Sequence, residues 1–290
     1  METALMFAAS SSLCFGIALV TSRIGLRTLD ARTGAAISVP TATLVYALCA
    51  PFAFDAQGFN LRAALLFAGV GLFFPALVTI LTFRSNEQLG PTLTGAVSGT
   101  AALFALLFAG LLLGERVPAQ AALACVAVVA GVAVMAWKQD AVRPGFVVRS
   151  LLWPLGGALL RGLAQAGAKA GLLLWPSPFA AGLIGYLVSS ATLVAGNRVG
   201  RSSRPNWHGP GISWFALTGA LNGAAVLLMY GALSLAPVTF VAPIVATYPL
   251  IAALASAVLL RDEPLTAGMW TGAAVTVLAI VYLVASKPGV

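Results

Sequence analysis

Residues 89–118 read LGPTLTGAVSGTAALFALLFAGLLLGERVP, and this stretch decides the class of the fold. No charged residue occurs between Pro91 and Gly114, whereas Glu115 and Arg116 follow directly. A helix that crosses the hydrocarbon core of a bilayer needs about 20 mostly apolar residues. The stretch therefore predicts one transmembrane helix that ends at a charged turn.

The composition of the whole chain indicates the same environment. Of its 290 residues, 60% are hydrophobic and only 8% are charged, whereas soluble domains carry about 25% charged residues. Too few charged side chains are present to cover a water-facing surface, and the chain is too apolar to be disordered. The apolar runs are long and continuous, unlike the short alternating segments of a transmembrane barrel. The sequence predicts an all-α polytopic protein of the cell (inner) membrane.

Apolar runs of similar length predict ten transmembrane helices. They cover residues 3–22, 34–54, 61–83, 90–113, 118–137, 151–175, 178–196, 211–233, 237–260 and 265–286. A polar stretch near the middle of the chain divides them into two groups of five. We therefore expect a first five-helix repeat over residues 1–137, a connecting loop over 138–150 and a second five-helix repeat over 151–290.

The two halves of the chain repeat each other at an offset of 146 residues. The coinciding pairs are Gly16 with Gly162, Arg23 with Lys169, Gly25 with Gly171, Leu89 with Leu235 and Pro91 with Pro237. Glu115 coincides with Glu263 after a slip of two residues. Because each half has an odd number of spans, the second half must cross the membrane in the opposite sense. Inverted repeats of this kind occur in secondary transporters, whose site lies at the repeat interface near the bilayer midplane.

Short motifs mark equivalent helix ends in the two halves. They are Ser10-Ser11-Ser12 with Gly16 in the first helix, Leu89-Gly90-Pro91, Gly114-Glu115, Leu235-Ala236-Pro237 and Asp262-Glu263-Pro264. With these motifs the chain resembles, over nearly its full length, the EamA-type carriers of the drug/metabolite transporter superfamily. The resemblance implies ten helices in two inverted five-helix repeats around a central cavity that exports amino acids or other small metabolites.

Arg161 is the leading candidate for a substrate ligand. It lies about 15 Å along the helix predicted over 151–175, at 1.5 Å per residue, and therefore near the bilayer midplane. A charge at that depth is costly and marks a functional site by default. No acidic residue falls near the middle of a predicted span, so a substrate carboxylate could be its partner. The alternative is that Arg161 extends to the interface or binds exposed backbone carbonyls. Gln165 follows on the same helix face, and for Lys169 we expect an interfacial position.

The ninth predicted helix offers a second set of candidates. Pro243 and Pro249 lie inside it, and an interior proline leaves the carbonyl four residues earlier unpaired. This frees the carbonyls of Thr239 and Val245 for a substrate, and Tyr248 could add a hydroxyl. The alternative is that the prolines only bend the helix to fit its neighbours.

Two further spans carry polar residues at membrane depth. Thr94 and Ser98 form a polar face on the fourth predicted helix, although Gly95 and Gly99 on the same helix favour helix packing as its role. Asn222 in the eighth helix could face the cavity or bind a neighbouring helix. For Glu115 we expect a capping role at a helix start, where the helix dipole favours an anion.

The sequence also excludes several activities. It has no phosphate-binding loop of the Gly-x-x-x-x-Gly-Lys-Ser/Thr type, and its single histidine supports neither a catalytic triad nor a paired-histidine metal site. We expect no cofactor and no metal.

We interpret the chain as a secondary transporter, an exporter of an amino acid or other carboxylate-bearing metabolite by alternating access. The alternative is a non-transporting membrane protein, either an assembly partner or a lipid-modifying enzyme. Expected partners are a small-molecule substrate and the lipid bilayer, without nucleic acid, and we treat the chain as a monomer.

The distribution of basic residues predicts the orientation in the membrane. The loops opposite the termini hold eleven Lys and Arg residues, whereas the terminal side holds three, Arg62, Arg116 and Lys287. By the positive-inside rule both termini then lie outside the cell, whereas the family resemblance implies cytoplasmic termini. A C-terminal reporter that is active only in the cytoplasm should stay inactive if the charge distribution decides, and strong activity would contradict it.

Overall fold

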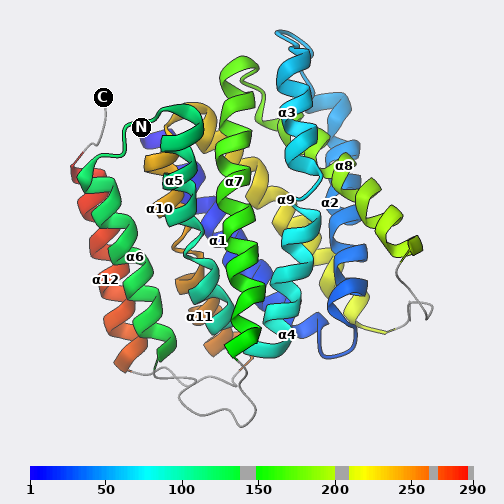
Figure 1. Ribbon diagram of the computed structural model, residues 1–290. Coiled ribbons are helices and arrows are strands. Elements are labelled where there is room, and N and C mark those ends of the chain that lie inside the picture. The colour runs from blue at the N-terminus through cyan, green and yellow to red at the C-terminus, as the bar shows by residue number, and fades with distance from the viewer. Residues whose placement is uncertain (138–147, 200–208, 261–266, 287–290) are drawn as a thin grey trace.

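The computed structural model describes residues 1–137, 148–199, 209–260 and 267–286 (Figure 1). The elements are α1 (Glu2–Gly25), α2 (Ala31–Ala53), α3 (Leu61–Gly71), α4 (Ala76–Ser98), α5 (Ala101–Leu113), α6 (Ala119–Trp137), the short 3-10 helix η1 (Val148–Leu151), α7 (Leu152–Leu174), α8 (Pro178–Val199), α9 (Gly211–Leu235), α10 (Val238–Val245), α11 (Tyr248–Leu259) and α12 (Ala267–Ala285). No strand occurs in these ranges, so the prediction of an all-α fold is confirmed.

Several helices are long and apolar enough to cross a membrane. Within the described residues these candidate spans are Glu2–Gly25, Ala31–Ala53, Leu61–Leu113, Pro178–Gly196, Gly211–Leu235 and Val238–Leu259. The segment Leu61–Leu113 contains 53 residues, which is enough for two crossings at about 20 residues each. Helix α7 is absent from this set, and its Arg161, Gln165 and Lys169 lower its mean hydropathy.

Breaks within three predicted spans (61–83, 90–113 and 237–260), together with one helix that joins two spans, explain why twelve α-helices of the described chain correspond to ten apolar runs. Helix α4 is kinked at Gly90, whose φ of 80° and ψ of 170° are not helical, and this backbone conformation favours glycine. The part of α4 before the kink continues α3, and the part after it continues into α5. The ninth span is likewise divided into α10 and α11. Grouped at these breaks, the twelve α-helices of the described chain follow the ten apolar runs.

The two repeats pack reciprocally. Helix α1 packs against α9 and α11, whereas its repeat equivalent α7 packs against α4 and α5. Helix α6 packs along its own equivalent α12, as Figure 1 shows at one side of the molecule. This exchange of equivalent neighbours is the packing that two interlocked inverted repeats produce.

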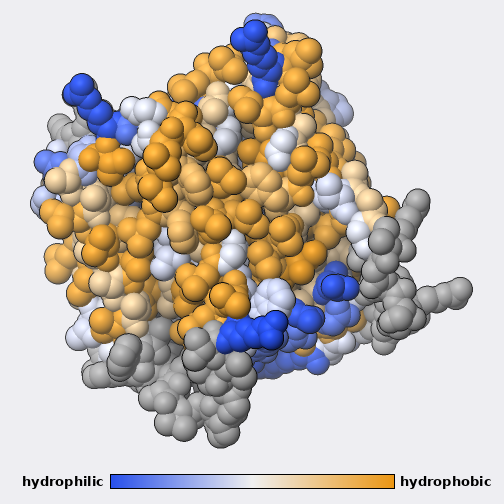
Figure 2. Space-filling model, viewed as in Figure 1, coloured by the Kyte–Doolittle hydropathy of each residue, from blue (hydrophilic) through white to orange (hydrophobic). Residues whose placement is uncertain are grey.

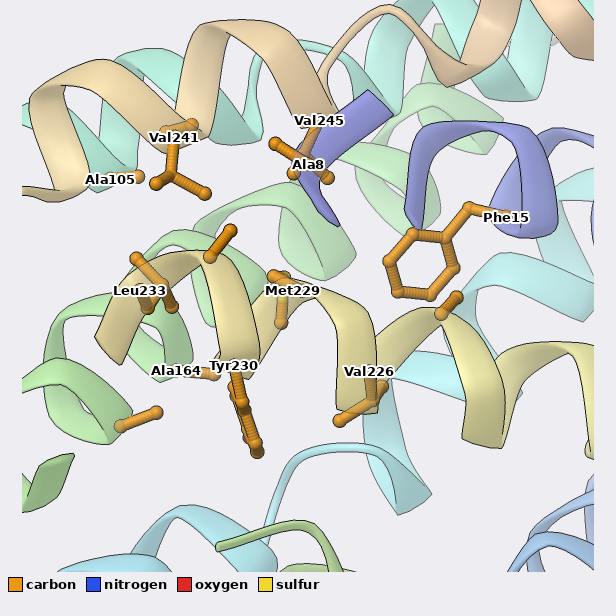
Figure 3. Packing of buried hydrophobic residues seen from close by; sticks show 14 of the residues in the cluster. Ala8, Phe15, Ala105, Ala164, Val226, Met229, Tyr230, Leu233, Val241 and Val245 are labelled. Atoms are coloured by element: carbon orange, nitrogen blue, oxygen red, sulfur yellow. The ribbon is translucent and has the colours of Figure 1, made fainter. Parts of the chain in front are cut away.

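Apolar side chains occupy both the interior and the outer surface of the helical bundle. In the interior, Val241 faces Ala105 and Val245 lies beside Ala8 (Figure 3). On the outside, Phe52 is 93% exposed, and Figure 2 shows hydrophobic residues over most of one face with hydrophilic residues near its ends. An apolar exterior of this kind suits contact with lipid tails rather than water, as expected for a multi-pass membrane protein.

Two repeat-equivalent glycines allow close helix contacts. A Cβ atom at Gly16 of α1 would lie 2.5 Å from the Cβ of Ile251 in α11. A Cβ atom at Gly162 of α7 would lie 2.6 Å from the Cβ of Phe104 in α5. Small residues at such positions let helix backbones approach closely, which is a main source of helix association in lipid.

We expect Gly16→Ala and Gly162→Ala to lower the melting temperature, because overpacking of a tight contact costs about 1–3 kcal/mol. The matched control is Gly69→Ala in α3, where no atom lies within 4 Å of the added Cβ. Thermal unfolding in detergent measures all three variants. Equal melting temperatures for Gly69→Ala and the two contact variants would contradict the assigned packing.

Candidate functional site

A cavity lies where the two repeats meet, between α1, α4, α7, α8, α9 and α11. Its walls are formed by Phe15, Ala18, Leu19, Phe74, Pro75, Val78, Thr79, Thr82, Phe83, Arg161, Tyr186, Asn222, Val226 and Tyr248. The cavity is small, with a volume of about 30 Å³, and it is partly open to the surroundings. Both repeats contribute walls, so the cavity has the position expected for the site of an inverted-repeat carrier.

Arg161 is held between two aromatic rings in this cavity. The central carbon of its guanidinium lies 5.2 Å from the ring centre of Phe15 and 5.4 Å from that of Tyr248. The side chain is 8% exposed, and its Nε atom has no hydrogen-bond partner. Among the described residues it makes no ion pair and binds no backbone carbonyl. Cation–π contacts are worth about 0.5–2 kcal/mol each, so the rings hold the guanidinium without neutralising its charge.

Other polar groups around Arg161 also lack partners. Within the described chain the buried hydroxyl of Tyr186 has no hydrogen-bond partner, whereas the Tyr248 hydroxyl lies within hydrogen-bonding reach of Ser98. Asn222 lines the cavity and makes no side-chain hydrogen bond to the part of the chain that the structure describes. Buried polar groups in proteins are nearly always hydrogen-bonded. Their concentration at one cavity makes it the candidate site for a polar ligand.

The structure brings Arg161, Asn222 and Tyr248 together in the cavity wall. The other predicted site residues of spans four and six, Thr94, Ser98 and Gln165, do not line the cavity. The Thr94 hydroxyl is 2.9 Å from the hydroxyl of Ser85. Gln165 follows Arg161 by one turn of α7 and is buried, with its Oε1 atom unpaired.

Thr239 and Val245 lie outside the cavity wall as well. Thr239 is buried near the start of α10, and Val245 is the last residue of that helix, where it packs beside Ala8 (Figure 3). Pro249 stands in the first turn of α11, a position where a helix amide has no partner in any case. It therefore begins a helix instead of interrupting one, and the expected kink at this proline is a turn between two helices.

The cavity contains residues that the sequence reasoning missed. Phe15 occupies the repeat position equivalent to Arg161, at the same offset of 146 residues, and this offset could have identified it. Tyr186, Thr79 and Thr82 also line the cavity. These three have no distinguishing spacing, because single hydroxyl-bearing residues occur throughout the predicted spans.

A basic residue binds each of the two helix ends that precede Pro91 and Pro237. Arg23 donates from Nη1 to the carbonyl oxygens of Asn86 and Glu87, at 2.7 and 3.1 Å. Lys169, its repeat equivalent, donates from Nζ to the carbonyl oxygens of Leu233 and Ala236, at 2.7 and 3.0 Å. The ammonium of Lys169 is thus buried against the C-terminus of α9, where the helix dipole favours a cation, and the interfacial position of Lys169 stays a prediction.

Glu115 binds the helix start that follows the same junction. Its two carboxylate oxygens accept the backbone N–H groups of Val238 and Thr239 at 3.1 and 3.2 Å. The expected capping role is thus present, but the capped helix is α10 of the opposite repeat and not the helix that follows Glu115 in sequence. The equivalent Glu263 lies outside the described residues.

The sequence matches the EamA-like transporter family over residues 2–137 and 148–285. A solved structure titled only "Crystal structure of protein" is similar to the chain with a TM-score of 0.79 and 15% sequence identity, over 99% of both chains. Identity this low supports a common fold alone. No curated protein matches the sequence.

We expect Glu115→Ala to lower the free energy of unfolding by about 1–2 kcal/mol, the usual cost of losing a helix cap. The matched control is Arg116→Ala, an exposed neighbour whose side chain makes no contact of this kind within the described chain. Thermal or denaturant unfolding in detergent compares the two. An unfolding curve of Glu115→Ala that matches wild type would show that the cap contributes nothing.

Proposed function

Because the chain belongs to the EamA-like transporter family, we propose that it exports an amino acid or another small carboxylate-bearing metabolite by alternating access. The family assignment confirms a multi-pass membrane transporter over the alternatives of an assembly partner and a lipid-modifying enzyme. The proposal for the substrate rests on one observation. Arg161 is a buried cation in the cavity between the repeats, and no carboxylate of the described chain pairs with it.

The setting of Arg161 favours a carboxylate. A guanidinium presents planar N–H groups that match the two oxygens of a carboxylate, and such bidentate pairs are among the strongest hydrogen-bonded contacts. Phe15 and Tyr248 lie against the guanidinium, which limits the directions from which a ligand can approach. A substrate carboxylate would also bring the hydroxyl of Tyr248 an acceptor.

The remaining walls suit the rest of an amino acid. Asn222, Thr79 and Thr82 offer neutral oxygen acceptors for an ammonium group, and none of the acidic side chains that the structure describes lines the cavity. Phe74, Val226 and their apolar neighbours supply hydrophobic surface for a side chain. We therefore favour a substrate that joins a carboxylate to an apolar substituent.

Reciprocal packing of the repeats supports alternating access. In inverted-repeat carriers, the site stays near the repeat interface while one part of the protein moves against the other. Phe15 and Arg161 come from equivalent positions of the two repeats and meet in the cavity. A ligand bound there would contact both moving halves.

Arg161→Ala is expected to reduce transport of the carboxylate substrate at least tenfold, since a hydrogen bond to a charged group contributes about 1.5–3 kcal/mol. Arg161→Lys should give a smaller loss, because it keeps the charge but lacks the planar fork. Counterflow into proteoliposomes measures transport by both variants. The substrates are apolar L-amino acids and the corresponding amino acid amides, in which a neutral carboxamide replaces the carboxylate.

The control variant is Arg62→Ala, which removes an exposed arginine at the start of α3. Thermal unfolding of all variants separates loss of function from loss of structure, and Arg161→Ala should remain folded because it removes a buried charge that has no protein partner. Undiminished transport by Arg161→Ala, or equal transport of acids and amides by wild type, would overturn the carboxylate assignment.

A further inference from the structure

A groove on the outer surface lies between α4 and α8, apart from the central cavity. Apolar side chains line most of it, among them Leu72, Leu77, Ile80, Leu81 and Leu193. Leu72 is 61% exposed, as suits a surface that faces lipid tails. The volume of the groove is about 440 Å³, and it is open to the surroundings.

The groove changes character along its length. Arg32, in the first turn of α2, and Trp153, in the first turn of α7, line it together with the apolar residues. Both helix starts follow loops on the membrane side opposite the termini, which is the side rich in basic residues. The stretch of α4 from Ala76 to Arg84 covers roughly 12 Å at 1.5 Å per residue, and Leu72 lies beyond it. The groove therefore extends from the basic membrane surface toward the bilayer middle.

A second arginine reinforces the charged end. The guanidinium carbon of Arg84 lies 5.8 Å from the ring centre of Trp153. Within the described chain, neither Arg32 nor Arg84 pairs its side chain with a carboxylate. Figure 2 shows hydrophilic residues gathered near the lower end of the displayed face, below a broad hydrophobic area. Tryptophan is enriched at this depth of the bilayer, where its ring meets the headgroups.

We propose that this groove binds an anionic phospholipid, with the phosphate at Arg32 and Arg84 and an acyl chain along α4 and α8. The occupant follows from charge complementarity combined with the apolar length of the groove. A soluble anion would satisfy the arginines alone and leave the groove uncovered, whereas a zwitterionic lipid would fill the groove with less charge compensation. Basic residues at a membrane surface contribute roughly fivefold each in affinity for anionic lipids.

Trp153 provides a direct readout of the site. The protein is reconstituted in phosphatidylcholine nanodiscs that contain increasing amounts of brominated phosphatidylglycerol or brominated phosphatidylcholine, whose bromines quench nearby tryptophans. The quenching of Trp153 is obtained by subtracting the fluorescence quenching of Trp153→Phe from that of the wild type. We expect the fraction of brominated phosphatidylglycerol that gives half-maximal quenching to be at least fivefold lower than the corresponding fraction of brominated phosphatidylcholine.

Two variants test the two ends of the groove. The double variant Arg32→Gln, Arg84→Gln should remove the preference for phosphatidylglycerol, whereas Arg62→Gln at the opposite membrane end should preserve it. Gly196→Leu places a side chain in the groove, where a Cβ meets no atom within 4 Å, and should weaken quenching by both lipids without a change in charge.

Equal quenching by the two brominated lipids would overturn the proposal, as would a preference that survives the double arginine variant. Inorganic phosphate is the remaining probe. If inorganic phosphate, at a concentration that carries the same total charge as the lipid, abolishes Trp153 quenching by brominated phosphatidylglycerol, the arginines form a site for free phosphate. The lipid assignment is then wrong. Retention of the lipid preference in the presence of phosphate supports the proposal.

Discussion

In the hydrocarbon core of a bilayer, every backbone polar group must find its partner within the protein. Helix ends leave backbone groups that need the same kind of partner, and α9 ends and α10 begins around Pro237, at the link between two spans. Lys169 binds the carbonyl oxygens on one side of that junction, and Glu115 binds the N–H groups on the other. Since Glu115 comes from the opposite repeat, the same bonds that satisfy the backbone also join the two halves of the protein.

The central cavity arises from a departure from this symmetry. Gly16 and Gly162 make equivalent close contacts, and Arg23 and Lys169 bind equivalent helix ends. The residues one place before the glycines differ, with an aromatic ring at Phe15 and a cation at Arg161. A fully symmetric pair of arginines would repel each other, and a symmetric pair of phenylalanines would give an apolar cavity. The unlike pair places one cation against one ring at the interface of the repeats.

The sequence predicts the fold well because hydrophobicity and repeats are local or one-dimensional signals. Ten apolar runs, the offset of 146 residues and the midplane depth of Arg161 could all be counted along the chain. The partners of Lys169 and Glu115 could not be counted in this way, because each lies on a helix that folding brings alongside. For the same reason, the spacing of Thr239 and Val245 to prolines predicts them at the site, whereas neither lines this cavity in the structure. Tyr186 enters the wall from α8 with no pattern in the sequence to indicate it.

The energetics of the buried arginine connect the architecture to transport. Burying a charge without a partner costs several kcal/mol even after relaxation, and two cation–π contacts of about 0.5–2 kcal/mol each offset only part of that cost. The substrate-free protein therefore holds a destabilised cation at the boundary of its two repeats, which the proposed alternating-access cycle would move against each other. A carboxylate that binds there recovers interaction energy in any conformation that keeps Arg161 between Phe15 and Tyr248. Since this gain is similar whichever side the site opens to, the contact with Arg161 would bind the substrate without fixing the direction of transport. Gradients across the membrane would then decide that direction.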